Sequence, residues 1–339
     1  MNRENCSLDL LKLIMSFVVV AIHSGLFAEK IYPFARLAVP TFFILTGYFS
    51  FCKINNVASS KAKVSAFRSI IKRNFALYFC WTLLLFPFIY YMRGFFAMGI
   101  AKGIPQMLAS IARGVSFVGS WYIYASIIAL GIIFFLSKYW SNQALFLFAI
   151  PFYLIATASS ELPFVYHVPL ISTAIKALSL IFGELCFGYP IALLYIVIGK
   201  IIADSKTKEY GAMVYLGGFL VCLIGLQFEF NYVEKWITAF YNRDCYFMLA
   251  PTSYFLIKLV LKMPLNLESP RILRKISVII YCTHGVVLAI ADKCLKLANC
   301  PDPTHILQYT LTILCCCILS ICITKLAKKP KLAFRHYFY

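Results

Sequence analysis

The sequence predicts an all-α integral membrane protein with about ten transmembrane helices and both termini in the cytoplasm. Hydrophobic residues make up 62% of its 339 residues, and the mean hydropathy is +0.82. Charged residues make up only 13%, about half of the roughly 25% that a soluble domain carries. Much of the surface must therefore face lipid. We see no internal repeat and no linker, so residues 1–339 are expected to form a single membrane domain.

A transmembrane helix needs roughly 20 predominantly apolar residues. The segment 166–182 is apolar but contains His167, Pro169 and Lys176, so it is either an interfacial or re-entrant helix or an eleventh span. The first apolar stretch lacks a convincing cleavage site and is expected to remain as the first helix. The ten predicted spans are 8–28, 34–52, 74–92, 119–137, 143–160, 185–203, 211–230, 244–261, 275–292 and 305–326.

The distribution of Lys and Arg predicts the orientation. With ten spans and a cytoplasmic amino terminus, 22 of the 32 Lys and Arg residues lie in cytoplasmic segments or at the cytoplasmic ends of the spans, as the positive-inside rule requires. An eleventh span would reverse every later segment and weaken this bias. The formal net charge of +19 does not indicate nucleic-acid binding, because the basic residues form short runs between apolar stretches.

The 13 cysteines have no spacing typical of a disulfide framework or a zinc site, and most lie within apolar stretches. A thiol there behaves as a small hydrophobic group. We expect no bound metal.

The first span carries a polar stripe. Asp9, Lys12, Ser16 and His23 fall on one face of a helix that is otherwise apolar, with Lys12 and His23 roughly 16 Å apart. Polar residues within a membrane are costly and indicate function. The alternative interpretation is a packed histidine above an Asp–Lys surface pair.

A second stripe, formed by Ser277, Tyr281 and His284, lies on the ninth span. Two of the five histidines thus lie well inside predicted membrane helices, whereas His305 stands only at the start of one. Histidine exchanges protons near neutral pH, which suits acid–base catalysis and also proton-coupled transport.

These residues belong to longer motifs. The spacing Lys12-x10-His23, with Asp9 three residues earlier, resembles the Arg-x10-His element in the first helix of the acyltransferase-3 family of membrane acyltransferases. The segment that runs from Arg36 through Val-Pro-Thr-Phe-Phe to Gly47 and a tyrosine resembles the family's Arg-x-x-Val-Pro-x-Phe-Phe-x-x-Ser-Gly-Tyr signature.

Two further elements follow in the family's order. The sequence Ser-Trp121-Tyr resembles the start of the family's fourth span, and Ser277 to His284 resembles a late Ser-x-x-Ile-Tyr-x-x-His segment. Two positions depart from the pattern: Lys12 replaces the usual Arg and so lacks its planar fork, and Thr46 replaces a serine but keeps the hydroxyl. The branch with this signature includes surface-glycan O-acetyltransferases and the membrane domains of serine racemases.

The resemblance implies a multi-pass enzyme of the bacterial cytoplasmic membrane. It would transfer acetyl from acetyl-CoA to a hydroxyl of a cell-surface glycan or lipid-linked sugar. We expect membrane lipid and this glycan as partners, and the sequence does not indicate an oligomeric state.

The resemblance also suggests roles for individual residues. His23 would be the general base or a transiently acylated group, Lys12 would hold the donor phosphates, and Asp9 would orient Lys12. Tyr281 and His284 would polarise the carbonyl or the acceptor.

Arg36 would hold the acceptor, with Trp121 beside it. Lys12 and Arg36 could instead extend to the interfaces, and Trp121 could belong to an aromatic belt.

Two other classes of function remain open. A proton-coupled transporter for a small molecule such as serine would also use paired histidines, but we see no matching halves. A glycan flippase or polymerase would favour long outer loops, and the longest here, 93–118, is modest and carries three basic residues.

Overall fold

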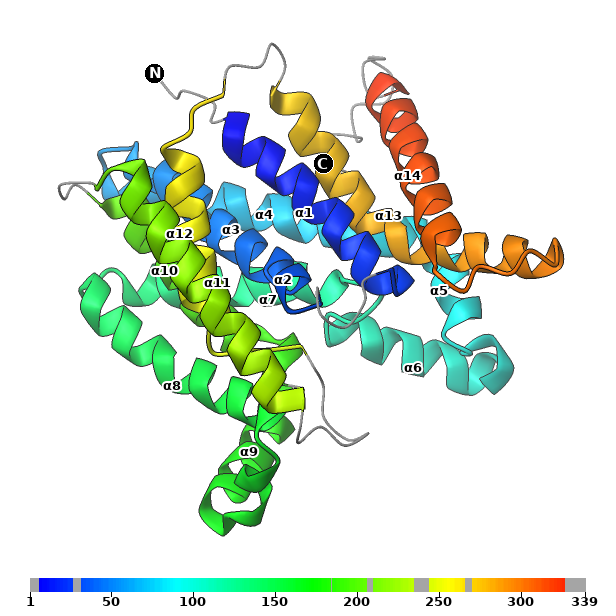
Figure 1. Cartoon of the computed structure of the whole chain (residues 1–339), viewed down its shortest axis with the longest axis horizontal. Helices are drawn as coiled ribbons and strands as arrows, with labels where there is room; N and C mark the ends of the chain where they lie inside the picture. The colour runs from blue at the N-terminus through cyan, green and yellow to red at the C-terminus, as the bar shows by residue number, and fades with distance from the viewer. Residues whose placement is uncertain are drawn as a thin grey trace. The chain divides into compact units, whose positions relative to one another are not determined.

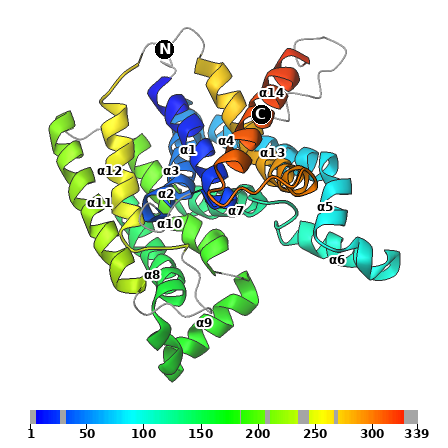
Figure 2. The same cartoon turned by 45° about the vertical axis from the view of Figure 1, so that its right-hand side comes forward.

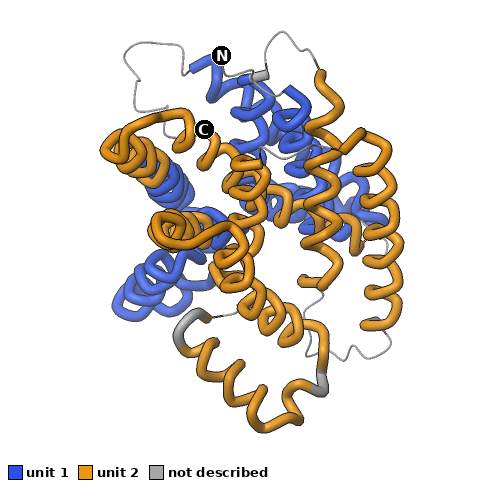
Figure 3. The backbone as a smooth tube through the Cα atoms, turned by 90° about the vertical axis from the view of Figure 1, so that its left-hand side faces the viewer, with its two compact units in different colours: residues 1–30, 72–124, 266–339 blue, residues 31–71, 125–265 orange. Residues whose placement is uncertain are grey.

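The structure is a computed structural model that describes residues 6–26, 32–183, 185–205, 210–234, 244–265 and 270–326. Helices account for 83% of these residues, and no strand occurs among them (Figure 1). The all-α prediction is therefore confirmed. The chain divides into two compact units, which we describe separately (Figure 3): unit 1 holds residues 1–30, 72–124 and 266–339, and unit 2 holds 31–71 and 125–265.

A helix forms at each of the ten predicted spans. Six of the described helical segments are long and apolar enough to cross a membrane, or seven if one bent pair counts as a single span. The count of ten and the cytoplasmic termini stay predictions. The corresponding helices are α1 (Cys6–Ser24), α3 (Ala38–Asn55), α4 (Ser60–Leu84) with α5 (Phe86–Met92), α7 (Ser120–Leu136), α8 (Asn142–Glu161), α10 (Tyr189–Asp204), α11 (Ala212–Glu234), α12 (Leu249–Leu261), α13 (Pro270–Leu297) and α14 (Ile306–Leu326).

The bent pair lies at the predicted span 74–92 and adds a break that the prediction did not include. The chain turns by 64° between α4 and α5. Pro87 lies in the first turn of α5, where its missing N–H costs nothing, but it cannot continue the hydrogen bonds of α4.

The shorter helices bear on two other predictions. The segment 93–118 is not a plain loop, because it contains η2 (Phe96–Met98) and α6 (Ile100–Ala112). Helix α9 (Pro169–Phe182) has 14 residues, about 21 Å, which is too short to cross roughly 30 Å of hydrocarbon. Helix α12, at one of the ten predicted spans, has only 13 residues, so length does not separate the interfacial or re-entrant interpretation of 166–182 from an eleventh span. The remaining short elements are α2 (Tyr32–Ala35), η3 (Pro163–His167) and η4 (Leu185–Phe187).

In unit 1, α1, α13 and α14 lie side by side (Figure 2). Val20, Ile280 and Cys316, one from each helix, are fully buried together. An ion pair joins the first turns of α1 and α13, so these helices run in the same direction. The end of α1 at Gly25 approaches His305, just before α14, so α14 runs the opposite way.

In unit 2, α10 is the central helix and is buried along almost its whole length. Gly47 of α3 packs directly on the backbone of α10, where an added Cβ would lie 2.6 Å from the Ile196 carbonyl oxygen. Gly199 of α10 meets the Ile44 carbonyl in the same way. The Thr46–Gly47 motif thus lies where these two helices touch through their backbones.

One end of unit 2 is closed by a polar network. The Asp204 carboxylate, at the end of α10, pairs with Lys200 and accepts hydrogen bonds from the amides of Asn55 and Asn142. Lys200 also donates to Asn142 Oδ1 at 2.7 Å. The ends of α3 and α10 and the start of α8 therefore meet at one end, as alternating spans require.

Two helices expose broad apolar faces. Only 17% of the most apolar window of α11, and the same share of α14, is buried. Exposed side chains include Val221 and Phe228 on α11 and Ile318 on α14. Apolar surface of this extent is suited to lipid.

We expect Gly47→Ala to destabilise the protein by about 1–3 kcal/mol, because the methyl group would clash with backbone that cannot rotate away. Gly217→Ala on α11 is the matched control, since a Cβ there meets nothing within 4 Å. Thermal unfolding in detergent measures both. Equal shifts in Tm would contradict the packing role.

Candidate active site

The two histidines of the polar stripes meet within unit 1. The rings of His23 on α1 and His284 on α13 have centroids 5.1 Å apart and planes inclined by 34°. His284 is fully buried, whereas His23 is exposed. The pair thus combines one accessible imidazole with one that is shielded from solvent.

The backbone fixes the tautomer of His284. Its Nδ1 lies 2.7 Å from the carbonyl oxygen of Tyr281, one turn earlier on α13. A carbonyl only accepts hydrogen bonds, so Nδ1 carries the proton and neutral His284 keeps a lone pair on Nε2. That buried Nε2 has no hydrogen-bond partner within the described part of the chain. His284 is therefore a hydrogen-bond acceptor at Nε2 unless it becomes an imidazolium.

Tyr281 is held from the other side by Gly119, just before α7. The Tyr281 hydroxyl donates to the Gly119 carbonyl at 2.9 Å, and its ring packs against those of Tyr122 and His284. Gly119 has φ +82°, and a Cβ there would lie 3.0 Å from the phenol oxygen. The phenol proton is thus directed to Gly119, and the polarisation of a substrate by Tyr281 stays a prediction.

Asp9 is held by a residue that the sequence did not single out. Its two carboxylate oxygens accept from Nε and Nη2 of Arg274, each at 2.9 Å, in a bidentate ion pair. Asp9 is fully buried, and the Arg274 side chain is 33% exposed. The remaining polar residue of the stripe, Ser16, donates to Leu13 of its own helix. Lys12 was the predicted partner of Asp9, but both carboxylate oxygens of Asp9 bind Arg274 instead.

Lys12 belongs to a cluster of basic side chains in unit 1. It interacts electrostatically with Arg73 of α4 as well as with Arg274 and Asp9. Three cations and one carboxylate leave two positive charges in excess. Such a cluster attracts an anion, and the guanidinium groups are suited to phosphate.

The other residues singled out from the sequence make none of the contacts described above for the histidines and the basic cluster. Trp121 is half-buried in the first turn of α7, in unit 1. Arg36, Thr46 and Gly47 belong to unit 2. There Arg36 forms an ion pair with Asp244 and packs over the Tyr32 ring, 4.3 Å from its centroid. Its charge already has a protein partner, and its role toward an acceptor stays a prediction.

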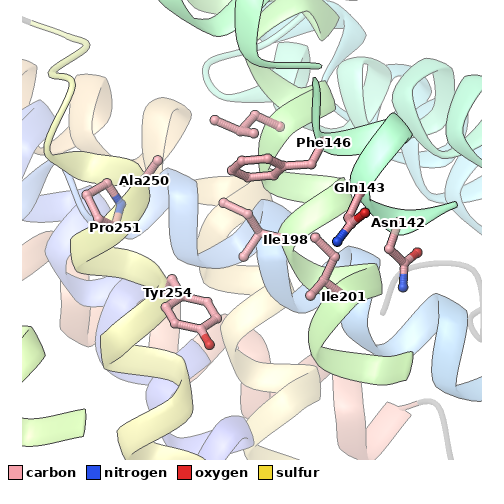
Figure 4. A pocket seen from close by; sticks show the side chains of 9 residues that line it. Asn142, Gln143, Phe146, Ile198, Ile201, Ala250, Pro251 and Tyr254 are labelled. Atoms are coloured by element: carbon pink, nitrogen blue, oxygen red, sulfur yellow. The ribbon is translucent and has the colours of Figure 1, made fainter. Parts of the chain in front are cut away.

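Unit 2 also contains an apolar pocket of about 500 Å³ between α8, α10 and α12 (Figure 4). Asn142 and Gln143 lie together on one side of it, and Tyr254 lines another part. Among the described residues no histidine, cysteine or charged side chain lines it, and the phenol of Tyr254 is its one ionisable group. Its lining is suited to a hydrocarbon chain.

Comparison with known proteins identifies the family. A family model described as an acyltransferase domain matches residues 5–325, nearly the whole chain. The chain belongs to the acyltransferase-3 family. It is also 23% identical, over 350 aligned positions, to an amino-acid racemase of Enterococcus faecalis. The match covers 98% of this chain but 47% of the racemase, so the chain spans about half the length of that relative. No solved structure matches the chain.

The family model and the apolar helices make the chain a membrane protein of this family, and the fold adds residues that the motifs did not single out. Arg274 and Arg73 both sit in basic runs and were counted only as topology signals. Arg274 could have been suspected, because it lies one turn before Ser277 on the polar face of α13. Gly119 gave no signal in the sequence, because its role depends on a tyrosine 162 residues later.

We expect Arg274→Ala to destabilise this acyltransferase by about 3 kcal/mol or more, because it leaves the buried Asp9 carboxylate without its partner. Lys296→Ala is the control on the same helix. It removes an exposed pair with Asp292, worth less than about 1 kcal/mol. Thermal unfolding in detergent measures both, and adding Asp9→Asn to the Arg274→Ala variant should recover part of the loss. An Arg274→Ala variant as stable as Lys296→Ala would refute the structural role.

Proposed function

We propose that the protein transfers an acetyl group from cytoplasmic acetyl-CoA to a hydroxyl of a cell-surface glycan or lipid-linked sugar, within a bacterial cytoplasmic membrane. Membership of the acyltransferase-3 family supports acyl transfer in general. One observation carries the assignment of the chemistry to these residues. An exposed His23 packs on a buried His284 whose tautomer is fixed by the backbone.

His23 is the general base of the proposed reaction. It takes the proton of the acceptor hydroxyl as that oxygen attacks the carbonyl carbon of the thioester. The tetrahedral intermediate then collapses, the carbon–sulfur bond breaks, and the thiolate of CoA receives the proton from His23. No net proton is consumed, and His23 returns to its starting state.

His284 supports the charge that forms on His23. Its Nε2 lone pair can accept a hydrogen bond from the imidazolium of His23, which shares the positive charge between two rings. Tyr281 and Gly119 hold His284 in this role, because the carbonyl of Tyr281 keeps the proton on Nδ1.

The basic cluster holds the donor in this proposal. Lys12, Arg73 and Arg274 would bind the phosphates of CoA, while Asp9 keeps Arg274 in place. The roughly 16 Å between Lys12 and His23 along α1 leaves room for the extended arm of CoA between its phosphates and its thioester. The acceptor would approach the exposed side of His23.

Replacing His23 by Ala should lower acetyl transfer by about 10²- to 10⁴-fold, the usual contribution of a general base. The measurement counts label from radiolabelled acetyl-CoA in the glycan and lipid fractions of membranes, at equal protein abundance. His167→Ala, which removes an exposed histidine of unit 2, should leave transfer unchanged.

The outcome also separates the classes of function. Label that persists in the His23→Ala variant would refute the base assignment. No label even with the unaltered protein, across a range of host glycans, would refute acetyl transfer and favour the transporter, for which serine uptake is the next test.

Removing the Lys12 side chain should raise the KM for acyl donors that carry phosphates and leave the KM for donors without phosphates unchanged. We expect Lys12→Ala to raise the KM for acetyl-CoA by about tenfold, the effect of one charge-assisted contact of roughly 1.4 kcal/mol. The KM for a truncated acetyl thioester of N-acetylcysteamine, which lacks phosphates, should hardly change. Lys176→Ala in unit 2 is the control. An equal rise for both donors would place Lys12 outside the donor site.

A further inference from the structure

A buried carboxyl group lies at the end of α8, in unit 2, and the acyl-transfer chemistry does not use it. Glu161 is 2% exposed, and both of its carboxyl oxygens are buried without a hydrogen-bond partner within the described residues. An ionised carboxylate without donors is far more costly in an apolar interior than the neutral acid. In a membrane domain such a residue indicates a functional site.

A second carboxyl group interacts with this one. Glu161 interacts with Glu229 of α11, and two ionised carboxylates cannot hydrogen-bond to each other, because both only accept. The oxygens of Glu229 accept from the backbone N–H groups of Phe247 at 2.6 Å and Met248 at 2.8 Å. These donors immediately precede α12, whose amino-terminal dipole also favours a negative charge. Glu229 is therefore the member of the pair that the fold equips to be ionised.

Among the described residues that interact with either carboxyl group, none is basic. Arg36, which lies near this end of the unit, is paired with Asp244. The other titratable side chains that interact with the pair are phenols and thiols, which cannot supply a positive charge: Tyr153 of α8, Tyr195 of α10, Cys186 of η4, and Cys245 before α12.

A second buried polar group without a hydrogen-bond partner lies on α8 near Glu161. Thr157 lies one turn before Glu161 on the same face of α8, is fully buried, and its hydroxyl has no partner within the described residues. Tyr153 lies a further turn back and donates to the Tyr246 carbonyl at 2.7 Å. A hydroxyl both accepts and donates, so Thr157 extends a polar path along α8 from Glu161.

We propose that Glu161 and Glu229 form a proton-binding site that is separate from the histidine pair. One proton resides on Glu161, which donates its O–H to the carboxylate of Glu229 after a small rotation of the side chain. Binding converts a carboxylate and a proton into a carboxylic acid, and no other bond changes. A proton fits this site where a sugar does not, because the oxygens of Glu161 have no solvent-accessible surface. The bound proton links α8 to α11 and, through Glu229, to the start of α12.

The state of the carboxyl group can be observed directly by infrared spectroscopy. In purified, intact protein at neutral pH, we expect a carbonyl stretch of a protonated carboxylic acid that is absent from Glu161→Gln. The band should decrease as the pH is raised. Asp292→Asn, which removes an exposed carboxylate paired with Lys296, should leave the band unchanged. Absence of the band in the unaltered protein would overturn the proposal.

Stability gives a second readout with a defined sign. Glu161 keeps its proton in the folded protein but ionises in the unfolded chain near its ordinary pKa of about 4.3. The folded state therefore holds more protons above that pH, and its stability falls as the pH rises. Between about pH 5 and pH 9, the Tm of the unaltered protein should fall more steeply than that of Glu161→Gln. Parallel slopes would refute the proposal.

Two controls keep the result decisive. If Glu161→Gln fails to fold, the pH titration of the infrared band in unaltered protein labelled with ¹³C-glutamate tests the same claim alone. Replacing sodium by choline in the buffer should change neither the band nor the Tm. A band that appears only without sodium would show that the pair binds a monovalent cation instead, and would overturn the proposal.

Discussion

The bidentate ion pair between Asp9 and Arg274 sets the geometry of unit 1. A buried carboxylate can be tolerated in an apolar helix only with a partner of opposite charge that fills its oxygens. Because this partner stands on α13, the pair fixes which faces of α1 and α13 meet and makes the helices run in the same direction. His23 and His284 then come together further along that seam, beyond the apolar contacts of Val20 and Ile280.

The same requirement for satisfied polar groups explains unit 2. Its central helix is nearly all apolar, and two groups of polar side chains lie at opposite ends of α8. At one end Asp204 is satisfied by a lysine and two amides. At the other, Glu229 is satisfied by backbone N–H groups, while Glu161 is left with none. The polar groups around Asp204 therefore form a structural network, whereas Glu161 is a carboxyl group that still lacks a hydrogen-bond partner among the described residues.

The periodicity of apolar and polar residues was sufficient to predict the helices and the two histidine-bearing stripes. It was not sufficient to predict what the stripes bind. Asp9 has Lys12 one turn away in sequence, yet its oxygens bind an arginine 265 residues later, and only the packing of α1 on α13 decides between them. Pro87 was a visible signal for the break between α4 and α5, but the span 74–92 was predicted from hydropathy alone. The role of Gly47 in backbone packing depends on α10 and could not be read from α3.

The left-handed conformation at Gly119 has a genetic consequence. Every codon change away from glycine adds at least a Cβ, at φ +82° and 3.0 Å from the Tyr281 hydroxyl. Such an allele would alter no atom of either histidine. It would instead displace the ring of Tyr281. The backbone carbonyl of that same residue accepts the hydrogen bond from Nδ1 of His284. A missense change in a connecting segment could thus abolish proton transfer while the fold, the ion pair and both imidazoles remained, and a suppressor would be sought on α13 rather than beside the altered residue.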